Sequence, residues 1–226
     1  MKFSMLQIKY IDVNCFQERS SIVWDEDGFC AFVDPGAETE GELQQLADII
    51  SSKNLKPVAI MLTHAHIDHV YGTAALMKRY GVPVYMHEQE KYTLEVTNPF
   101  LCKSFGLKSP DDFSEGTSFV KDGDIIKVGS LSFEVLETPG HSKGGICLLE
   151  RNEKVLFSGD TLFAGAIGRT DHPGGDYDLL MKSIFEKLLM LEGDTRVIPG
   201  HGPETEIASE RMTNPFLLPF NEPYED

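Results

Sequence analysis

Basic side chains are scarce in this chain. Its 226 residues include 20 Lys and Arg against 36 Asp and Glu, which gives a formal net charge of −16 at pH 7. Affinity for nucleic acid comes largely from Lys and Arg that neutralise phosphates, and anionic lipid surfaces attract the same side chains. The shortage therefore argues against a nucleic-acid-binding protein and against a protein held at a membrane surface.

Cysteine pairs and long apolar runs are also missing. The four cysteines, Cys15, Cys30, Cys102 and Cys147, form no Cys-x-x-Cys pair, so we expect small buried residues rather than a zinc knuckle or a redox dithiol. No stretch of about 18 apolar residues is present, which argues against a membrane-spanning helix. The first residues lack the apolar core and cleavage site of a secretion signal, and we therefore expect a cytoplasmic protein.

The composition that remains is typical of an ordinary globular protein, with 41% hydrophobic and 25% charged residues. We interpret residues 1–226 as a single domain, because no linker-like segment divides the chain. A cluster of strand-like runs followed by alternating helix-like and strand-like segments occurs twice, which suggests two similar halves. The first half predicts strands at 3–10, 21–24, 29–33, 58–62 and 82–86 with helices at 39–53, 70–80 and 88–96, and the second half predicts strands at 125–128, 131–138, 145–150, 155–158 and 196–198 with a helix at 178–191.

Residues 97–115 form the longest segment without a clear periodic pattern. The segment contains Pro99, Gly106 and Pro110, which are typical of irregular structure. Two interpretations stay open: a loop that lies over the active site, or a plain surface connection.

Three of the seven histidines fall within six residues, in Thr63-His64-Ala65-His66-Ile67-Asp68-His69. This cluster follows an expected buried strand, and the ends of strands in layered α/β proteins are where functional side chains are usually placed. Imidazole and carboxylate are favoured ligands of zinc and other first-row metals. The density of such groups favours a metal site over an ordinary core or surface role.

Three further strand ends each present a ligand-type side chain beside a glycine. His141 and His201 each end a Pro-Gly-His tripeptide, and Asp160 ends Ser158-Gly159-Asp160. Glycine allows the backbone to turn sharply at such points. The candidate metal ligands are therefore His64, His66, Asp68, His69, His141, Asp160 and His201. Five imidazoles and two carboxylates are too many for one tetrahedral ion and the right number for two.

The motif His-x-His-x-Asp-His at 64–69, followed in order by His141, Asp160 and His201, resembles the metallo-β-lactamase superfamily up to about residue 215. The resemblance implies an α/β fold of the α+β kind, a four-layer αββα sandwich of two mixed β-sheets flanked by helices. It implies two divalent ions, with zinc as the first expectation and iron or manganese as alternatives. The implied ligands are His64, His66 and His141 for one ion, Asp68, His69 and His201 for the other, and Asp160 as the bridge.

Within the superfamily, Gly159-Asp160-Thr161-Leu162-Phe163, Gly168-Arg169-Thr170-Asp171 and Gly200-His201-Gly202-Pro203 are similar to glyoxalase II-like hydrolases, above all the short hydroxyacylglutathione hydrolase-like type. The bridging Asp160 argues against true β-lactamases, which lack it. Glyoxalase II proper has a helical C-terminal domain that supplies basic residues for glutathione, whereas only residues 202–226 follow the last ligand here. The resemblance thus implies a metal-dependent thioesterase, but it does not specify the thiol that forms the second half of the substrate.

The implied mechanism uses a hydroxide nucleophile, because two ions roughly 3.5–4 Å apart lower the pKa of a shared water toward about 7. Asp68 is the candidate catalytic residue that orients this hydroxide, with ligation alone as the alternative. The local charge of such a site is positive, so we expect an anionic small-molecule thioester, with Lys143 and Arg169 as candidate substrate-binding residues. For these two residues a structural interpretation is equally open: a solvated lysine, and an arginine paired with Asp171.

Two other functions fit parts of the pattern. A persulfide dioxygenase of the same superfamily also has the His-x-His-x-Asp-His motif and a Gly-Arg-Thr-Asp stretch, and it holds one iron through two His and one Asp. A non-catalytic metal-binding module is the alternative of another class, which lost ligands would support. The complete set of seven ligands favours the hydrolase. His87 and His172 match no part of the motif, so we expect neither to be a ligand, and the pattern carries no signal for an oligomeric state.

Overall fold

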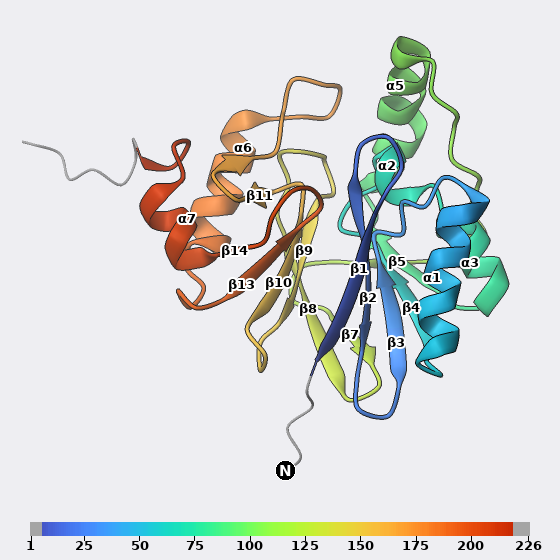
Figure 1. The fold of residues 1–226 in the computed structure, drawn as a ribbon. Helices are drawn as coiled ribbons and strands as arrows, with labels where there is room; N and C mark the ends of the chain where they lie inside the picture. The colour runs from blue at the N-terminus through green and yellow to red at the C-terminus, as the bar shows by residue number, and fades with distance from the viewer. Residues whose placement is uncertain (1–5, 219–226) are drawn as a thin grey trace, which may run out of the picture.

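In a computed structural model, which describes residues 6–218, two six-stranded sheets pack face to face and helices cover the outer side of each (Figure 1). This is the αββα sandwich that the resemblance implies. Each half of the chain builds one of the two sheets, in line with the two strand clusters of the sequence.

The first sheet starts antiparallel and continues parallel. Strands β1 to β3 form an antiparallel meander, and β3, β4, β5 and β6 then pair in parallel. Its strands, in spatial order, are β1 (Gln7–Val13), β2 (Glu18–Trp24), β3 (Phe29–Val33), β4 (Lys56–Met61), β5 (Val84–His87) and β6 (Thr117–Val120).

The second sheet is antiparallel except for one parallel pair, between β10 and β13. Its strands, in spatial order, are β14 (Thr205–Glu206), β13 (Arg196–Pro199), β10 (Val155–Gly159), β9 (Ile146–Glu150), β8 (Leu131–Glu137) and β7 (Ile125–Val128). A separate small ribbon consists of β11 (Leu162–Phe163) and β12 (Ala166–Ile167).

The helices lie in the connections between strands. They are α1 (Glu40–Ser52), α2 (Ile67–Val70), α3 (Thr73–Tyr80), α4 (Glu90–Tyr92), the π-helical η1 (Thr93–Thr97), α5 (Asn98–Phe105), the 3₁₀ turn η2 (Ser114–Gly116), α6 (Tyr177–Ser183), the π-helical η3 (Ile184–Leu188) and α7 (Ile207–Thr213). None of these helices, which all lie within the described range 6–218, is long and apolar enough to cross a membrane.

Three clusters of buried apolar side chains hold the four layers together. Alternate side chains along a buried strand belong to different clusters. On β3, Phe32 packs toward the helices α1 and α3, whereas Ala31 and Val33 face the second sheet. On β9, Leu148 faces the first sheet, whereas Leu149 packs toward α6 and α7. Side chains on successive strand positions point to opposite faces, so strands covered on both faces are apolar throughout. The sandwich therefore fixes the strand ends, and with them the loops that carry the candidate ligands.

The prediction of an irregular connection at residues 97–115 is wrong for part of the segment, because residues 98–105 form helix α5. Pro99 lies in the first turn of α5, directly after the π-helical η1. Gly106 ends the helix in the left-handed conformation, with φ of 69°. The two residues that indicated a loop are the start and stop signals of a helix.

Smaller corrections concern strand ends and cysteines. The first expected strand begins at residue 3, which lies outside the described residues, and β1 runs from Gln7 to Val13. Cys30 and Cys147 are buried as expected, but Cys15 is exposed and Cys102 is partly exposed. Cys15 lies in the tight turn between β1 and β2, where no core is available to cover it.

Candidate metal centre

The seven candidate ligands come together at one edge of the sandwich, from the ends of four strands. His64 and His66 follow β4, and Asp68 and His69 lie on α2 just after them. The remaining three follow β8, β10 and β13, and are His141, Asp160 and His201. The rigid strands on both sheets therefore position one shared cluster.

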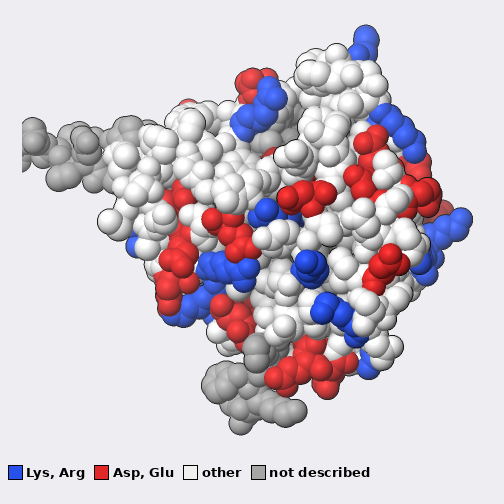
Figure 2. Space-filling view, viewed as in Figure 1, with Lys and Arg blue, Asp and Glu red and all other residues white. Residues whose placement is uncertain are grey.

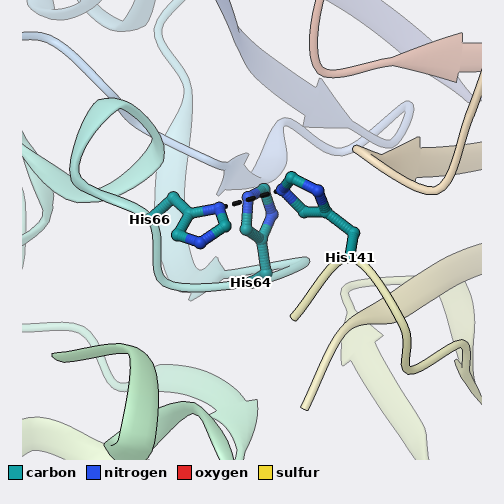
Figure 3. Close-up of side chains that lie close together, drawn as sticks. All are labelled: His64, His66 and His141. Atoms are coloured by element: carbon teal, nitrogen blue, oxygen red, sulfur yellow. Dashed lines mark hydrogen bonds between the residues drawn. The ribbon is translucent and has the colours of Figure 1, made fainter. Parts of the chain in front are cut away.

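Three imidazoles form the first ligand group. One nitrogen each of His64, His66 and His141 lies within 4.8 Å of the others, and all three side chains are buried. Nδ1 of His66 lies 2.9 Å from Nε2 of His141, with the His64 ring beside them (Figure 3). Nitrogens that converge in this way are suited to a single ion.

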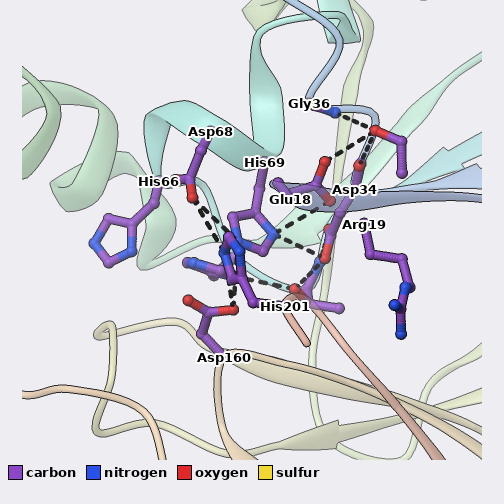
Figure 4. Close-up of polar contacts among 12 residues, drawn as sticks. Glu18, Arg19, Asp34, Gly36, His66, Asp68, His69, Asp160 and His201 are labelled. Atoms are coloured by element: carbon purple, nitrogen blue, oxygen red, sulfur yellow. Dashed lines mark hydrogen bonds and ion pairs between the residues drawn. The ribbon is translucent and has the colours of Figure 1, made fainter. Parts of the chain in front are cut away.

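Asp68, His69 and His201 form the second ligand group. Their ligand atoms also lie within 4.8 Å of one another. Oδ2 of Asp68 is 3.2 Å from Nε2 of His201 and 3.8 Å from Nε2 of His69. Figure 4 shows the three side chains directed toward the same point, with Asp160 beside them.

Asp160 lies between the two groups and presents one oxygen to each. Its Oδ1 is 3.4 Å from Nε2 of His69 and 3.7 Å from Nε2 of His201, both members of the second group. Its Oδ2 is 3.5 Å from Nε2 of His141, a member of the first group. This is the arrangement required of a bridging carboxylate.

Several atoms of the cluster are buried without a hydrogen-bond partner among the described residues. They include Nε2 of His64, Nε2 of His69 and Oδ1 of Asp160. An unsatisfied buried polar atom costs about 1–3 kcal/mol, and native proteins contain few of them. Divalent metal ions would satisfy these atoms, so the residues present fit a two-metal site.

The far nitrogens of the imidazoles fix the orientation of the rings. Nδ1 of His141 donates to the carbonyl oxygen of Arg169 at 2.7 Å, and Nδ1 of His201 donates to the carbonyl oxygen of Phe16 at 3.1 Å. Because a carbonyl can only accept, each Nδ1 carries the proton and each Nε2 keeps its lone pair for a metal.

Asp34 fixes the orientation of His69 in the second group by the same kind of hydrogen bond. The sequence patterns did not predict this role. Its buried carboxylate accepts from Nδ1 of His69 at 3.2 Å and from the backbone N–H and hydroxyl of Thr63 at 2.7 and 2.5 Å. Asp34 has φ of 46°, a left-handed conformation that few non-glycine residues adopt and that Asp adopts more readily than most. The available signal was an acidic residue directly after a buried strand and before Pro35-Gly36.

Glu90 is a second functional residue that sequence reasoning missed. Its fully buried carboxylate accepts from the backbone N–H of Ala65 at 2.6 Å and of Gly144 at 2.8 Å. One side chain on α4 thereby joins the loop of His64 and His66 to the loop of His141. Nothing in the helical pattern around position 90 distinguishes this Glu from a solvated one.

In each of the two Pro-Gly-His tripeptides, the position before the histidine requires a glycine. A Cβ at Gly200 would lie 2.5 Å from Oδ1 of Asp160 and 2.6 Å from the His69 ring. Gly140 has φ of 138°, and a Cβ there would lie 2.2 Å from the backbone nitrogen of Leu180. At Gly200 the neighbouring ligand side chains leave no room for a Cβ. At Gly140 both the positive φ and the nearby backbone of Leu180 exclude one.

Burial and mutual charge set the protonation of the cluster. Burial lowers the pKa of His64 and of His66 well below its usual range, which favours the neutral ligand form. For Asp160, burial raises the pKa, but the imidazoles of His69, His141 and His201 together outweigh burial and hold that pKa well below its usual range. Asp160 is therefore a carboxylate at neutral pH.

The two candidate substrate-binding residues have different surroundings. Arg169 lines the cavity of about 400 Å³ above the ligands, but its guanidinium donates to Asp171 at 2.7 and 3.0 Å, which is the structural ion pair of the alternative interpretation. Lys143 lines a separate cavity, and its Nζ lies 3.6 Å from the centroid of the Tyr92 ring. The geometry gives no support to Lys143 as a guide for a substrate at the ligands.

The two histidines outside the motif also differ. His87 lies in the separate cavity of Lys143, where its Nε2 is 3.1 Å from Oε1 of Glu137. His172 lines the ligand cavity, with its ring centroid 4.8 Å from that of His66 and 5.0 Å from that of His141. Neither belongs to a ligand group among the described residues.

Segment 97–115 lies over the site, because Leu101, Phe105 and Leu107 line the ligand cavity. Of the two interpretations, this agrees with a segment that covers the site and not with a plain surface connection. Phe16, from the turn between β1 and β2, lines the same cavity. The opening above the ligands is therefore bounded by apolar side chains from two distant parts of the chain.

Comparisons with known proteins agree with this geometry. The profile of the Metallo-beta-lactamase superfamily matches residues 13–201. The hydroxyacylglutathione hydrolase GloC of Haemophilus influenzae is 40% identical over 213 residues, covering 94% of this chain and 98% of GloC.

Two solved structures are similar over almost their whole length. The BLEG-1 B3 metallo-beta-lactamase superposes with a TM-score of 0.85 and 35% identity, over 93% of this chain and 99% of that one. TTHA1623 in a di-iron-bound form superposes with a TM-score of 0.80 and 35% identity, over 92% of this chain and 100% of that one.

Proposed function

Because the chain belongs to the metallo-beta-lactamase superfamily, and is a metallo-hydrolase of that superfamily, we propose that it is a dinuclear hydrolase of small thioesters. The observation that carries the proposal is the position of Asp160, whose two oxygens face two complete ligand groups. A mononuclear enzyme has no need of a second complete group or of a carboxylate between the two.

The relatives support both parts of the proposal. The relative from Haemophilus influenzae is named as a hydroxyacylglutathione hydrolase, and hydroxyacylglutathiones are thioesters. A structural neighbour is described in a di-iron-bound form, which is consistent with two ions in this fold. We propose two divalent ions, with zinc first and iron or manganese as alternatives.

The side chains divide the work between holding and orienting. His64, His66 and His141 would hold one ion, and Asp68, His69 and His201 the other. When bound, two such ions supply a hydroxide nucleophile near neutral pH and polarise the substrate carbonyl. Asp34 fixes the ring of His69 through Nδ1, and Asp160 remains ionised between the two groups.

Asp68 is the proposed catalytic residue, because its carboxylate belongs to the second group and also lines the cavity. It orients the attacking oxygen toward the substrate carbonyl. In the overall reaction water adds to the carbonyl carbon, the carbon–sulfur bond breaks, and a carboxylic acid and a thiol leave. The cavity that Asp68 lines is large enough for part of a small substrate.

A parallel assay of three substrates tests the proposal. The purified protein, with its metal content measured, is given S-lactoylglutathione, glutathione persulfide with oxygen, and a chromogenic β-lactam. We expect about two metal ions per chain and turnover of the thioester in preference to the others. One iron per chain with oxygen uptake on the persulfide, or faster turnover of the β-lactam, would replace the proposed function.

A further inference from the structure

The cavity above the candidate ligands has a polar floor and apolar walls. Its volume is about 400 Å³, at the lower end of the range for small-molecule sites. The floor consists of the ligand side chains, and the walls are Phe16, Ile67, Leu101, Phe105 and Leu107. Apolar walls of this kind contribute binding energy by removing apolar substrate surface from water.

Unpaired cations are not found among the described residues that line this cavity. Arg169 is the one Lys or Arg of the lining, and Asp171 accepts two hydrogen bonds from it. The side chains of the lining therefore offer no free cation to a charged thiol, whereas they offer several apolar contacts to an uncharged group.

The two aromatic wall residues are exposed to solvent, and hydrogen bonds hold the backbone of Phe16 in place. Phe105 is 66% exposed and Phe16 is 41% exposed. The backbone N–H of Phe16 donates to Asn14 Oδ1 at 2.9 Å, and the side chain of Asn14 donates in turn to the carbonyl oxygen of Asp68 at 2.9 Å. The carbonyl oxygen of Phe16 receives the hydrogen bond from His201. The same contacts that orient the second ligand group thus position Phe16.

A second part of the wall comes from helix α5 and the residue after its cap. The backbone N–H groups of Gly106 and Leu107 both donate to the carbonyl oxygen of Cys102. The first of these hydrogen bonds caps the helix, and the second is 3.1 Å long. This closure turns Leu107 back toward the cavity beside Leu101 and Phe105. Figure 2 shows few charged side chains over α5, so the apolar wall continues onto an uncharged surface.

We infer that this cavity selects thioesters with an uncharged acyl chain, which packs against Phe16, Leu101 and Phe105. The inference rests on the proposed thioester hydrolysis and names its acyl substrate. A cavity of this size accommodates the acyl half, and the larger thiol half extends through the open side into solvent. Exposed aromatic side chains at a concave site are a recurrent mark of ligand binding.

The test is a series of acetyl, butanoyl and hexanoyl thioesters of N-acetylcysteamine, a small uncharged thiol, given to the metal-loaded protein. We expect kcat/KM to rise about two- to four-fold for each added methylene. The substitution Phe105→Ala is expected to flatten this rise. Phe100→Ala is the matched control, because Phe100 lies on the same helix, is 50% exposed and does not line the cavity.

A binding measurement separates this inference from the proposed function. Calorimetric titration with acetate, butanoate and hexanoate, the acids released by hydrolysis, is expected to show tighter binding with each methylene, and Phe105→Ala is expected to reduce that trend. Thioester turnover without any chain-length trend would overturn the acyl selectivity and leave the hydrolase. Tighter binding of longer acids without thioester turnover would overturn the hydrolase and leave the apolar site.

Discussion

The ligand atoms of this site depend on hydrogen bonds that their own residues make on the opposite side. His69, His141 and His201 each donate Nδ1–H to a protein oxygen, and this fixes which nitrogen faces the centre. The ligand types were predictable from sequence because they repeat at strand ends. Their supports, Asp34 and Glu90, were not predictable, because nothing about a single Asp or Glu reveals which backbone N–H it will meet after folding.

At the residue scale, the two imidazoles His66 and His172 offer a direct comparison. Both line the cavity and their rings are in contact, but only His66 belongs to a ligand group. We expect His66→Ala to lower the metal content from about two ions per chain to about one and His172→Ala to leave it near two. Metal analysis of both purified variants, with circular dichroism to confirm folding, is the measurement. Equal metal loss in the two would contradict the ligand assignment.

At the scale of elements, the helical stretch α4, η1 and α5 shows where sequence patterns mislead. Pro99 and Gly106 are usually signs of a loop, but here they lie in the first turn and at the C-cap of α5. Asn98 at the start of α5 donates its side-chain amide to the carbonyl oxygen of Ala65 at 2.8 Å, in the loop between two ligands. The stretch is held against the site, and its end forms a cavity wall. A contact between residues 33 positions apart leaves no trace in local periodicity.

The buried carboxylate of Glu90 is the main attachment of this stretch. Glu90→Ala would leave the buried N–H groups of Ala65 and Gly144 without their acceptor, at about 1–3 kcal/mol each. We expect the free energy of unfolding to fall by about 2–5 kcal/mol, with weaker metal binding. Denaturant unfolding measures this. Glu88→Ala, which changes an exposed side chain two residues away, is expected to stay within about 0.5 kcal/mol of the parent, and a similar loss in both variants would refute the role of Glu90.

At the scale of the whole molecule, the sandwich brings two half-sites together. The first sheet and its connections supply His64, His66, Asp68 and His69, and the second supplies His141, Asp160 and His201. Strand-like runs predicted most strands of both sheets, but not the edge strands β6 and β14, and the resemblance to the superfamily implied the fold. What the sequence left open was the environment of the centre. The expected cations Lys143 and Arg169 are engaged with Tyr92 and Asp171, and the walls around the centre are apolar.

We propose that both half-sites hold metal and act together on a thioester. Titration of the metal-free protein with zinc, while hydrolysis of the butanoyl thioester is followed, tests it most directly. We expect a rate that rises until about two equivalents per chain are bound and then stays constant. A rate that reaches its maximum at one equivalent and does not change with the second would contradict it.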